Sequence, residues 1–205
     1  MSTRYESLFL VEPVIAVDDA VALSPKERVR EVSRLGEIAK TIRGGKLDAM
    51  LESGAPTLSL EKVLALFNQH QVEYLVVGGY AVAFHGYPRF TRDLDLFFRQ
   101  TPENAGRIFA ALSEAGFTDL TVTRNDLLHP QLNYKLGRPP NQIDLNPDVK
   151  GITWATANQC AVAGEILSQP VKFIDFDTLI LAKRAAGRSQ DLADIDGLMR
   201  LLGEI

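Results

Sequence analysis

Two carboxylates lie two residues apart within a run that otherwise has the pattern of a buried strand. Residues 91–98 alternate between polar and apolar at first and then become fully apolar, which is typical of a central strand. Because side chains alternate across a strand, Asp93 and Asp95 leave from one face while Leu94 and Leu96 point into the core. Neighbouring carboxylates raise each other's pKa unless a cation neutralises them. The alternative, a solvated strand edge, is disfavoured by the apolar neighbours.

A third acid lies in a second short strand pattern. Asp144 stands between Ile143 and Leu145 in the predicted strand 142–145. If this strand lies beside the first, three carboxylates meet over one cleft, and if it does not, Asp144 is an isolated surface acid. Oxygen ligands in this number suit Mg²⁺, or Mn²⁺ in its place, with substrate phosphates completing the coordination. Asp93, Asp95 and Asp144 are therefore the predicted metal ligands and catalytic residues.

Two glycines follow the β-prone run 74–77 and precede a predicted short helix, 80–85. Glycine allows the backbone to approach a phosphate closely, and the free N–H groups at a helix start favour negative charge. Gly78 and Gly79 are thus candidate nucleotide contacts, although a Gly-Gly pair alone is a weak signal.

Helix and strand signals in the rest of the chain predict an α/β (α+β) fold, with a mixed, twisted sheet and flanking helices. The strands 132–136 and 142–145 are separated by a short loop, which predicts antiparallel neighbours. Further strands are expected at 118–123 and 171–176, and further helices at 59–70, 102–115, 153–160, from Asp177 to Gly187 and from a cap at Ser189.

The N-terminal quarter of the chain differs from the remainder. Ser24 is followed by a Pro at the first helical position and by Glu27, which predicts a helix start. Gly54-Ala55-Pro56 has the composition of a joint. We therefore divide the chain into an N-terminal helical arm, residues 1–57, and a sheet-containing domain, residues 58–205.

Composition narrows the class of protein. The formal net charge of −4 argues against a surface built for duplex DNA, which is usually strongly basic. Cys160 is the only cysteine, so no intrachain disulfide forms and a reducing compartment is expected. No segment approaches about 20 consecutive apolar residues, the length of a membrane span. The sequence predicts a cytoplasmic protein that does not act at a membrane.

The stretch 74–96, YLVVGGYAVAFHGYPRFTRDLDL, resembles the Gly-Gly loop, helix and Asp-x-Asp strand of the polymerase-beta-like nucleotidyltransferases. The likeness covers about residues 60 to 202 and is greatest to the small bacterial nucleotidyltransferases that include abortive-infection toxins. It implies a helical C-terminal portion, a turn at Gly78 and Gly79, two acids at Asp93 and Asp95, and a later acid at Asp144.

A C-terminal motif of that family, Arg-x-Lys-Asp-x-x-Asp, maps onto Arg188, Asp191 and Asp194, with Gln190 in place of the Lys. Loss of this cation removes a charge-assisted contact to phosphate, for which Lys183 or Arg184 is a substitute. The resulting nucleotide-binding set is Gly78, Gly79, Arg89, Lys183, Arg188 and Asp191. The simpler interpretation is that these cations form surface ion pairs or complement a helix dipole.

The resemblance implies transfer of a nucleoside monophosphate from a nucleoside triphosphate such as ATP to a hydroxyl of an RNA, protein or small-molecule acceptor. Two other interpretations stay open. One is a fold that binds a nucleotide or a partner without turnover, which the Gln190 exchange favours. The other is a toxin-antitoxin component acting on tRNA, which the acidic net charge does not independently support.

Overall fold

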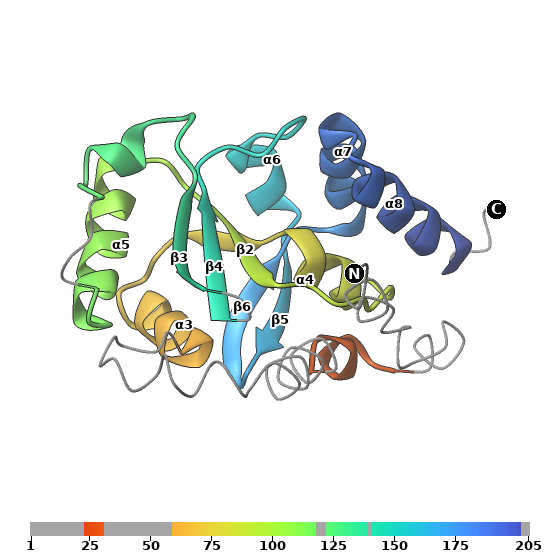
Figure 1. The fold of residues 1–205 in the computed structure, drawn as a ribbon, viewed down its shortest axis with the longest axis horizontal. Helices are drawn as coiled ribbons and strands as arrows, with labels where there is room; N and C mark the ends of the chain where they lie inside the picture. The colour runs from red at the N-terminus through yellow and green to blue at the C-terminus, as the bar shows by residue number, and fades with distance from the viewer. Residues whose placement is uncertain (1–22, 31–58, 118–121, 139–140, 202–205) are drawn as a thin grey trace, which may run out of the picture.

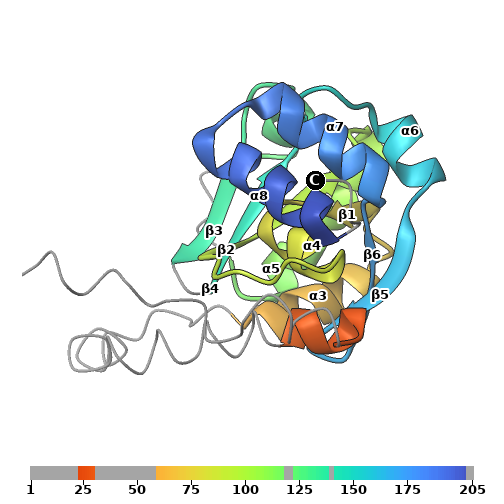
Figure 2. The same cartoon turned by 90° about the vertical axis from the view of Figure 1, so that its right-hand side faces the viewer.

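The computed structural model describes residues 23–30, 59–117, 122–138 and 141–201. Within them, six strands form one mixed sheet in the order β3-β4-β2-β1-β6-β5. Helices flank the sheet, with α3 on the opposite side from α6 and α7 (Figures 1 and 2). The predicted α/β fold is confirmed.

The four inner strands of the sheet are β4 (Asn141–Asn146), β2 (Asp93–Phe98), β1 (Tyr74–Val76) and β6 (Gln169–Phe173). Strand β2 runs parallel to β4 and antiparallel to β1, and β1 runs parallel to β6. The edge strand β3 (Tyr134–Arg138) forms the predicted antiparallel hairpin with β4. The other edge strand, β5 (Val162–Ile166), pairs antiparallel with β6.

Two of the predicted helices begin at side-chain caps that the sequence indicates. Ser59 accepts a hydrogen bond from the backbone N–H of Lys62 at the start of α3 (Leu60–Gln69), and Thr101 caps α5 (Pro102–Glu114) in the same way. The other helices within residues 59–201 are α4 (Gly78–Phe84), the 3₁₀ turn η2 (Asp126–Leu128), α6 (Trp154–Gln159), α7 (Phe176–Ala186) and α8 (Ser189–Leu201).

The core lies where α3 and the inner strands meet. Val63, Leu64 and Phe67, the predicted apolar face of α3, are almost completely buried. Leu94 and Leu96 have no exposed surface. The alternation within β2 thus places its leucines in the core and its two acids on the other face, as predicted.

Several predicted boundaries are wrong. Strand β5 was not expected, and the strand expected at 171–176 is β6, which ends at Phe173. Helix α7 is capped by Asp175, whose side chain accepts from the N–H of Thr178, and not by Asp177. Helix α4 begins at Gly78 rather than at residue 80, and Ser189 is the first residue of α8. Of the strand predicted at 118–123, residues 118–121 lie outside the described residues, and Val122 and Thr123 are in a loop.

A short part of the predicted N-terminal arm is described and contacts the domain. Residues 25–30 are helical, and the Ser24 hydroxyl and the Glu27 carboxylate form the expected capping box. The Lys26 ammonium lies 2.9 Å from the carboxylate of Glu165 on β5, and Arg28 donates to the backbone oxygen of Phe84 on α4. The rest of the arm lies outside the described residues, so the boundary at residue 57 stays a prediction.

No helix among the described residues has the length and apolar character needed to cross a membrane.

Candidate functional site

The register of β2 and β4 brings the predicted acids together. Asp95 is paired directly with Asp144 across the two parallel strands, and Asp93 is paired with Gln142. Because paired residues share a face and alternate residues of β2 share it too, the carboxylates of Asp93, Asp95 and Asp144 project from the same side of the sheet. The condition set by the sequence, that the third acid lies beside the first two, is met.

The electrostatics of Asp95 reflect this convergence. Burial, followed by the charges of Asp93 and Asp144, raises the pKa of Asp95 to about 7, and this exceeds the opposing influence of Arg188 and Lys183. Ionising Asp95 beside two other carboxylates is therefore unfavourable in the absence of a cation. A bound cation would remove this repulsion and favour the ionised form.

Asp144 is partly compensated by neighbouring side chains. Its Oδ1 accepts a hydrogen bond of 2.6 Å from the amide of Gln142, and its Oδ2 lies 3.0 Å from the ammonium of Lys135 on β3. The hydrogen bond to Asp144 and the charges of all three acids raise the pKa of Lys135. The Lys135 side chain is 65% exposed, so a ligand can displace this ammonium without opening the core.

Gly78 has a steric reason to be glycine. Its φ is +63°, and a Cβ there would overlap the carboxylate of Asp95. Gly79 is also closely packed, since a Cβ would lie 2.8 Å from the side chain of Thr91. The hydroxyl of Thr91 in turn donates to Asp93 Oδ1 at 3.0 Å. The glycine pair therefore allows the first turn of α4 to pack against the strand that carries the acids.

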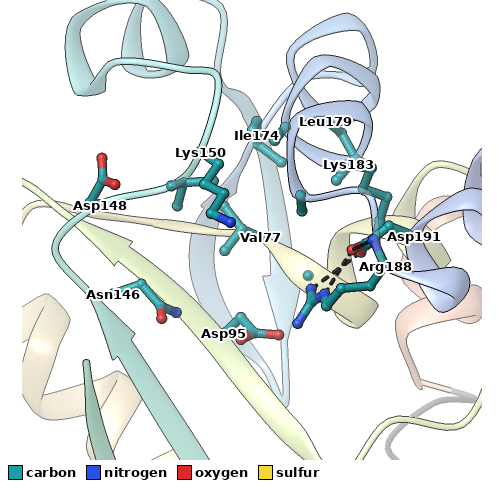
Figure 3. Close-up of a pocket in the computed structure, with 14 residues that line it drawn as sticks. Val77, Asp95, Asn146, Asp148, Lys150, Ile174, Leu179, Lys183, Arg188 and Asp191 are labelled. Atoms are coloured by element: carbon teal, nitrogen blue, oxygen red, sulfur yellow. Dashed lines mark hydrogen bonds and ion pairs between the residues drawn. The ribbon is translucent and has the colours of Figure 1, made fainter. Parts of the chain in front are cut away.

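A cavity of about 290 Å³ opens beside Asp95. Figure 3 shows Asp95 at its floor, with Lys150 and Arg188 directed toward the space from different sides. Its lining combines polar side chains with an apolar wall from α7 and the ends of the strands: Val77, Gly78, Asp95, Asn146, Asp148, Val149, Lys150, Ile174, Leu179, Ala182, Lys183, Ala186, Arg188 and Asp191.

Three of the lining residues, Lys183, Arg188 and Asp191, belong to a cluster of charges that extends away from the cavity to Asp194 and Arg89. The ammonium of Lys183, with 6% of its side chain exposed, hydrogen-bonds Asp191 at 3.2 Å and Asp194 at 2.6 Å. Arg89 reaches Asp194 with two nitrogens, at 2.5 and 2.8 Å, and Arg188 reaches Asp191 at 2.7 Å. Lys183 thus contacts Asp191 and Asp194, the two acids of the C-terminal motif. The motif has a Lys at the position of Gln190, and in this chain the Gln190 amide donates to Asp194 at 3.0 Å.

The predicted site residues separate into two groups. Gly78, Asp95, Lys183, Arg188 and Asp191 line the cavity. The other predicted residues, Asp93, Asp144, Gly79 and Arg89, do not line it, and Arg89 is engaged by Asp194.

Sequence reasoning missed three polar lining residues, Asn146, Asp148 and Lys150. They follow Asp144 at the end of β4 and in the loop after it. The only sequence signal was their position between that strand and the Gly151 turn.

The acids at the site offer a limited set of metal ligands. Among the described residues, no group of three or more His, Cys, Asp or Glu side chains is placed to hold a metal ion. Asp93 and Asp95 nevertheless supply two carboxylates on one face, one of them with a raised pKa. Mg²⁺ commonly takes one or two carboxylates together with waters and substrate phosphates, so this donor set fits the ion in that mode.

The fold and the acid-bearing strands define a nucleotidyltransferase-type protein. Residues 59–196 match the family described as aminoglycoside-2''-adenylyltransferase, and the chain belongs to that family. This places it within the polymerase-beta-like nucleotidyltransferases, as the Gly-Gly and Asp-x-Asp pattern predicted, and makes it a nucleotidyltransferase.

The comparison with solved structures found matches of low sequence identity. A candidate nucleotidyltransferase from Thermotoga maritima is 17% identical, with 71% of this chain and 91% of that chain covered and a TM-score of 0.48. The lincosamide adenylyltransferase LnuA, solved with lincomycin, is 15% identical, with 71% and 99% covered and a TM-score of 0.47. The antibiotic-resistance factor ANT(2'')-Ia is 16% identical, with 70% and 82% covered and a TM-score of 0.43. No curated protein matches the chain.

Proposed function

We propose that this protein transfers a nucleoside monophosphate from a nucleoside triphosphate to a hydroxyl group of a small-molecule acceptor, with Mg²⁺ or Mn²⁺ as cofactor. The observation that carries the proposal is the convergence of Asp93, Asp95 and Asp144 on one sheet face, beside a cavity that also presents cationic side chains. Membership of a family described by an adenylyl-transfer activity supports the same reaction class.

In this proposal Asp93 and Asp95 hold the ion, which when bound would neutralise charge on the transferring phosphoryl group. Asp144 completes the site and accepts the proton of the acceptor hydroxyl. The acceptor oxygen forms a bond to the α-phosphorus, and the bond from that phosphorus to the bridging oxygen of the β-phosphate breaks. Pyrophosphate leaves with that oxygen.

Gly78, Arg188, Lys183 and Asp191 form the nucleotide side of the site in this proposal, together with Gly79 and Arg89 in the surrounding shell. Arg188 is the cation of this set best placed to contact phosphate, because its side chain is 78% exposed while it lines the cavity. Lys183 and Arg89 support the site indirectly, since their charged groups are held by Asp191 and Asp194.

The family description favours a small polyhydroxylated acceptor over RNA or protein. The acidic net charge of −4 gives no independent support to a tRNA acceptor. Nucleotide transfer to tRNA by a toxin-antitoxin component is the alternative, and the assay below, which includes total RNA as an acceptor, would detect it.

One observation favours the rival function, a module that binds a nucleotide without turnover. Both carboxylate oxygens of Asp144 are engaged, by Gln142 and by Lys135. If neither partner is displaced by substrate, Asp144 cannot take a proton from an acceptor.

The test is release of pyrophosphate by the full chain with each of the four nucleoside triphosphates and Mg²⁺, with an aminoglycoside, total RNA or no acceptor added. The Asp93→Asn/Asp95→Asn double variant should lose at least about 10³-fold in rate, the scale on which preorganised electrostatic groups contribute. Asp196→Asn, an exposed acid on α8 that does not line the cavity, is the matched control and should keep the wild-type rate.

Four outcomes are separable. Release that depends on the aminoglycoside supports the proposal, and release that depends on RNA redirects it to a tRNA acceptor. Tight triphosphate binding without release under any condition favours the rival, and wild-type turnover in the double variant removes the assigned roles of the two acids.

A further inference from the structure

The cavity beside Asp95 presents three cationic side chains, and they differ in how far each is already neutralised. Lys183 is buried between two acids, Asp191 and Asp194. Arg188 donates twice to Asp191, at 2.7 and 3.2 Å. Lys150 is the third, and among the described residues that line the cavity it is the cation without a hydrogen bond or an ion pair to the protein.

The position of Lys150 is fixed by the backbone that carries it. Gly151, the next residue, has a φ of +81°, and a Cβ there would lie 2.5 Å from the Cβ of Ala185 on α7. The loop after β4 therefore packs directly against α7, and the N–H of Ile152 closes its turn on the oxygen of Val149. In Figure 3 the Lys150 side chain extends from this loop over the cavity, toward Val77.

An ammonium in this position has physical consequences. Exposed lysines commonly pair with nearby acids or extend into solvent, whereas Lys150 extends over the cavity and forms no ion pair with the acids that line it. A polyphosphate entering the cavity would give the Lys150 ammonium a negatively charged partner. A hydrogen bond from Lys to phosphate is of the stronger, charge-assisted kind. The other two cations offer less because each already has a carboxylate partner.

We propose that Lys150 binds the phosphates of the nucleoside triphosphate, acting as the cation that holds the pyrophosphate portion while the nucleoside monophosphate is transferred. This inference rests on the proposed function and adds a residue to it. It also reassigns Lys183, which lines the same cavity, from phosphate contact to positioning of α7 and α8.

The experiment measures binding of ATP, AMP and pyrophosphate to the full chain by calorimetry, for the wild type and for Lys150→Ala, Lys150→Arg and Lys172→Ala. Lys172 is the matched control, since it is an exposed lysine on β6 whose side chain makes no ion pair within the described residues and lies outside the cavity lining. Loss of a charge-assisted contact to phosphate should weaken ATP and pyrophosphate binding by about tenfold or more in Lys150→Ala. AMP binding should change less than about twofold, Lys150→Arg should keep most of the affinity, and Lys172→Ala should match the wild type.

Two failures are distinguishable. If the wild type binds ATP and Lys150→Ala binds it equally well, or if AMP binding falls by the same factor as ATP binding, the role of Lys150 is wrong while the proposed function stands. The wild type is also titrated with the other three nucleoside triphosphates and Mg²⁺. If it binds none of the four, the proposed function fails first, and this inference fails with it. The melting temperature of each unliganded variant checks folding, which the exposed positions of both lysines should leave unchanged.

Discussion

At the scale of single residues, Asp95 links stability to function. It is paired with Asp144, it contacts the glycine turn of α4, and it lies at the floor of the cavity. Each of these placements removes water from a carboxyl group or adds a like charge near it. The structure therefore carries an electrostatic cost at neutral pH that a bound cation would relieve, which is a common arrangement at catalytic sites.

The cost predicts how stability depends on pH. Because the pKa of Asp95 is raised to about 7 by burial and by the charges of Asp93 and Asp144, the folded state prefers the protonated form. Its favourable contribution is fully present below the unfolded pKa of about 4 and is lost as the pH rises through about 7. Asp95→Asn, which mimics the protonated form, should therefore stabilise the metal-free protein at pH 8 by about 2 kcal/mol. This is roughly half the free energy that the pKa shift of Asp95 represents, because the side chain is partly exposed and solvent screens its charge.

Urea denaturation at pH 8 and pH 4 without divalent ions measures this difference. The gain should shrink toward zero at pH 4, where the wild-type carboxyl is already protonated. Asp196→Asn, the exposed acid on α8, should show no comparable gain at either pH. A stabilisation of Asp95→Asn that is equal at both pH values would contradict the electrostatic explanation.

At the scale of elements, α8 is docked closely against the loop that precedes β2. A Cβ on Gly197 of α8 would lie 2.6 Å from the ring of Tyr87, and Asp194, one turn earlier, holds Arg89. The same loop continues to Thr91, whose hydroxyl contacts Asp93. The C-terminal helix thus supports the acid-bearing strand from a distance.

This packing predicts opposite effects for two glycine substitutions. In an open helix interior, Gly→Ala stabilises by about 1 kcal/mol, and Gly106 on α5, with nothing within 4 Å of its Cβ position, should behave in this way. Gly197→Ala should instead destabilise by about 1–2 kcal/mol, because the Tyr87 ring must move. Chemical denaturation of both variants gives the comparison, and a stabilised Gly197→Ala protein would show that α8 is not packed against Tyr87.

Elements also show which features the sequence could and could not predict. Strand β5 was missed because the turn to β6 consists of Leu167 and Ser168, both with positive φ, where a hairpin turn usually has Asn or Gly. Pro170, within β6, also argued against a strand. By contrast, the caps at Ser59 and Thr101 and the acids of β2 depend on local patterns and were predicted correctly.

At the scale of the whole molecule, one buried cluster joins segments far apart in the sequence. Lys183 on α7, Asp191 and Asp194 on α8 and Arg89 before β2 meet in it. Neither this pairing nor the register of Asp95 with Asp144 follows from local sequence, because both depend on how distant segments assemble. The sequence therefore indicated Gly78, Asp95 and Arg188 as candidates that the structure places at the cavity. It did not indicate that Lys183 is neutralised by two acids or that Lys150 overhangs the cavity.

The cluster predicts a large effect for a substitution that preserves side-chain size. Burial raises the pKa of Asp191, but hydrogen bonds from Arg188 and Lys183 outweigh it and hold that pKa below its ordinary value. Burial also raises the pKa of Asp194, and there Arg89 and Lys183 outweigh it, so that this pKa is lowered as well. Lys183→Met leaves two buried acids with fewer cations and should cost about 3 kcal/mol at pH 7.

The pH dependence separates this electrostatic loss from lost packing. A depressed carboxyl pKa contributes stability above the unfolded value near 4, and that stability is lost as the pH falls through the folded pKa. The difference between wild type and Lys183→Met should therefore narrow below pH 4. Arg184→Met, on the exposed side of α7, should stay within about 0.5 kcal/mol of the wild type throughout. A gap that is constant with pH would point to packing as its cause.

The described part of the N-terminal arm is held to the same core. Val29 is 2% exposed and belongs to the main hydrophobic cluster, and Lys26 and Arg28, which precede it in the same helix, contact β5 and α4. Val29→Asp places a carboxylate in that apolar contact and should lower the free energy of unfolding by about 3 kcal/mol, whereas Arg30→Ala, an exposed neighbour, should have little effect.

Trp154, the single tryptophan, packs against Phe97 of the sheet, so its fluorescence reports unfolding of the domain. If Val29→Asp leaves the midpoint of that signal unchanged, the segment is an appendage; if the midpoint falls, the structural unit that folds around the acids begins before residue 58.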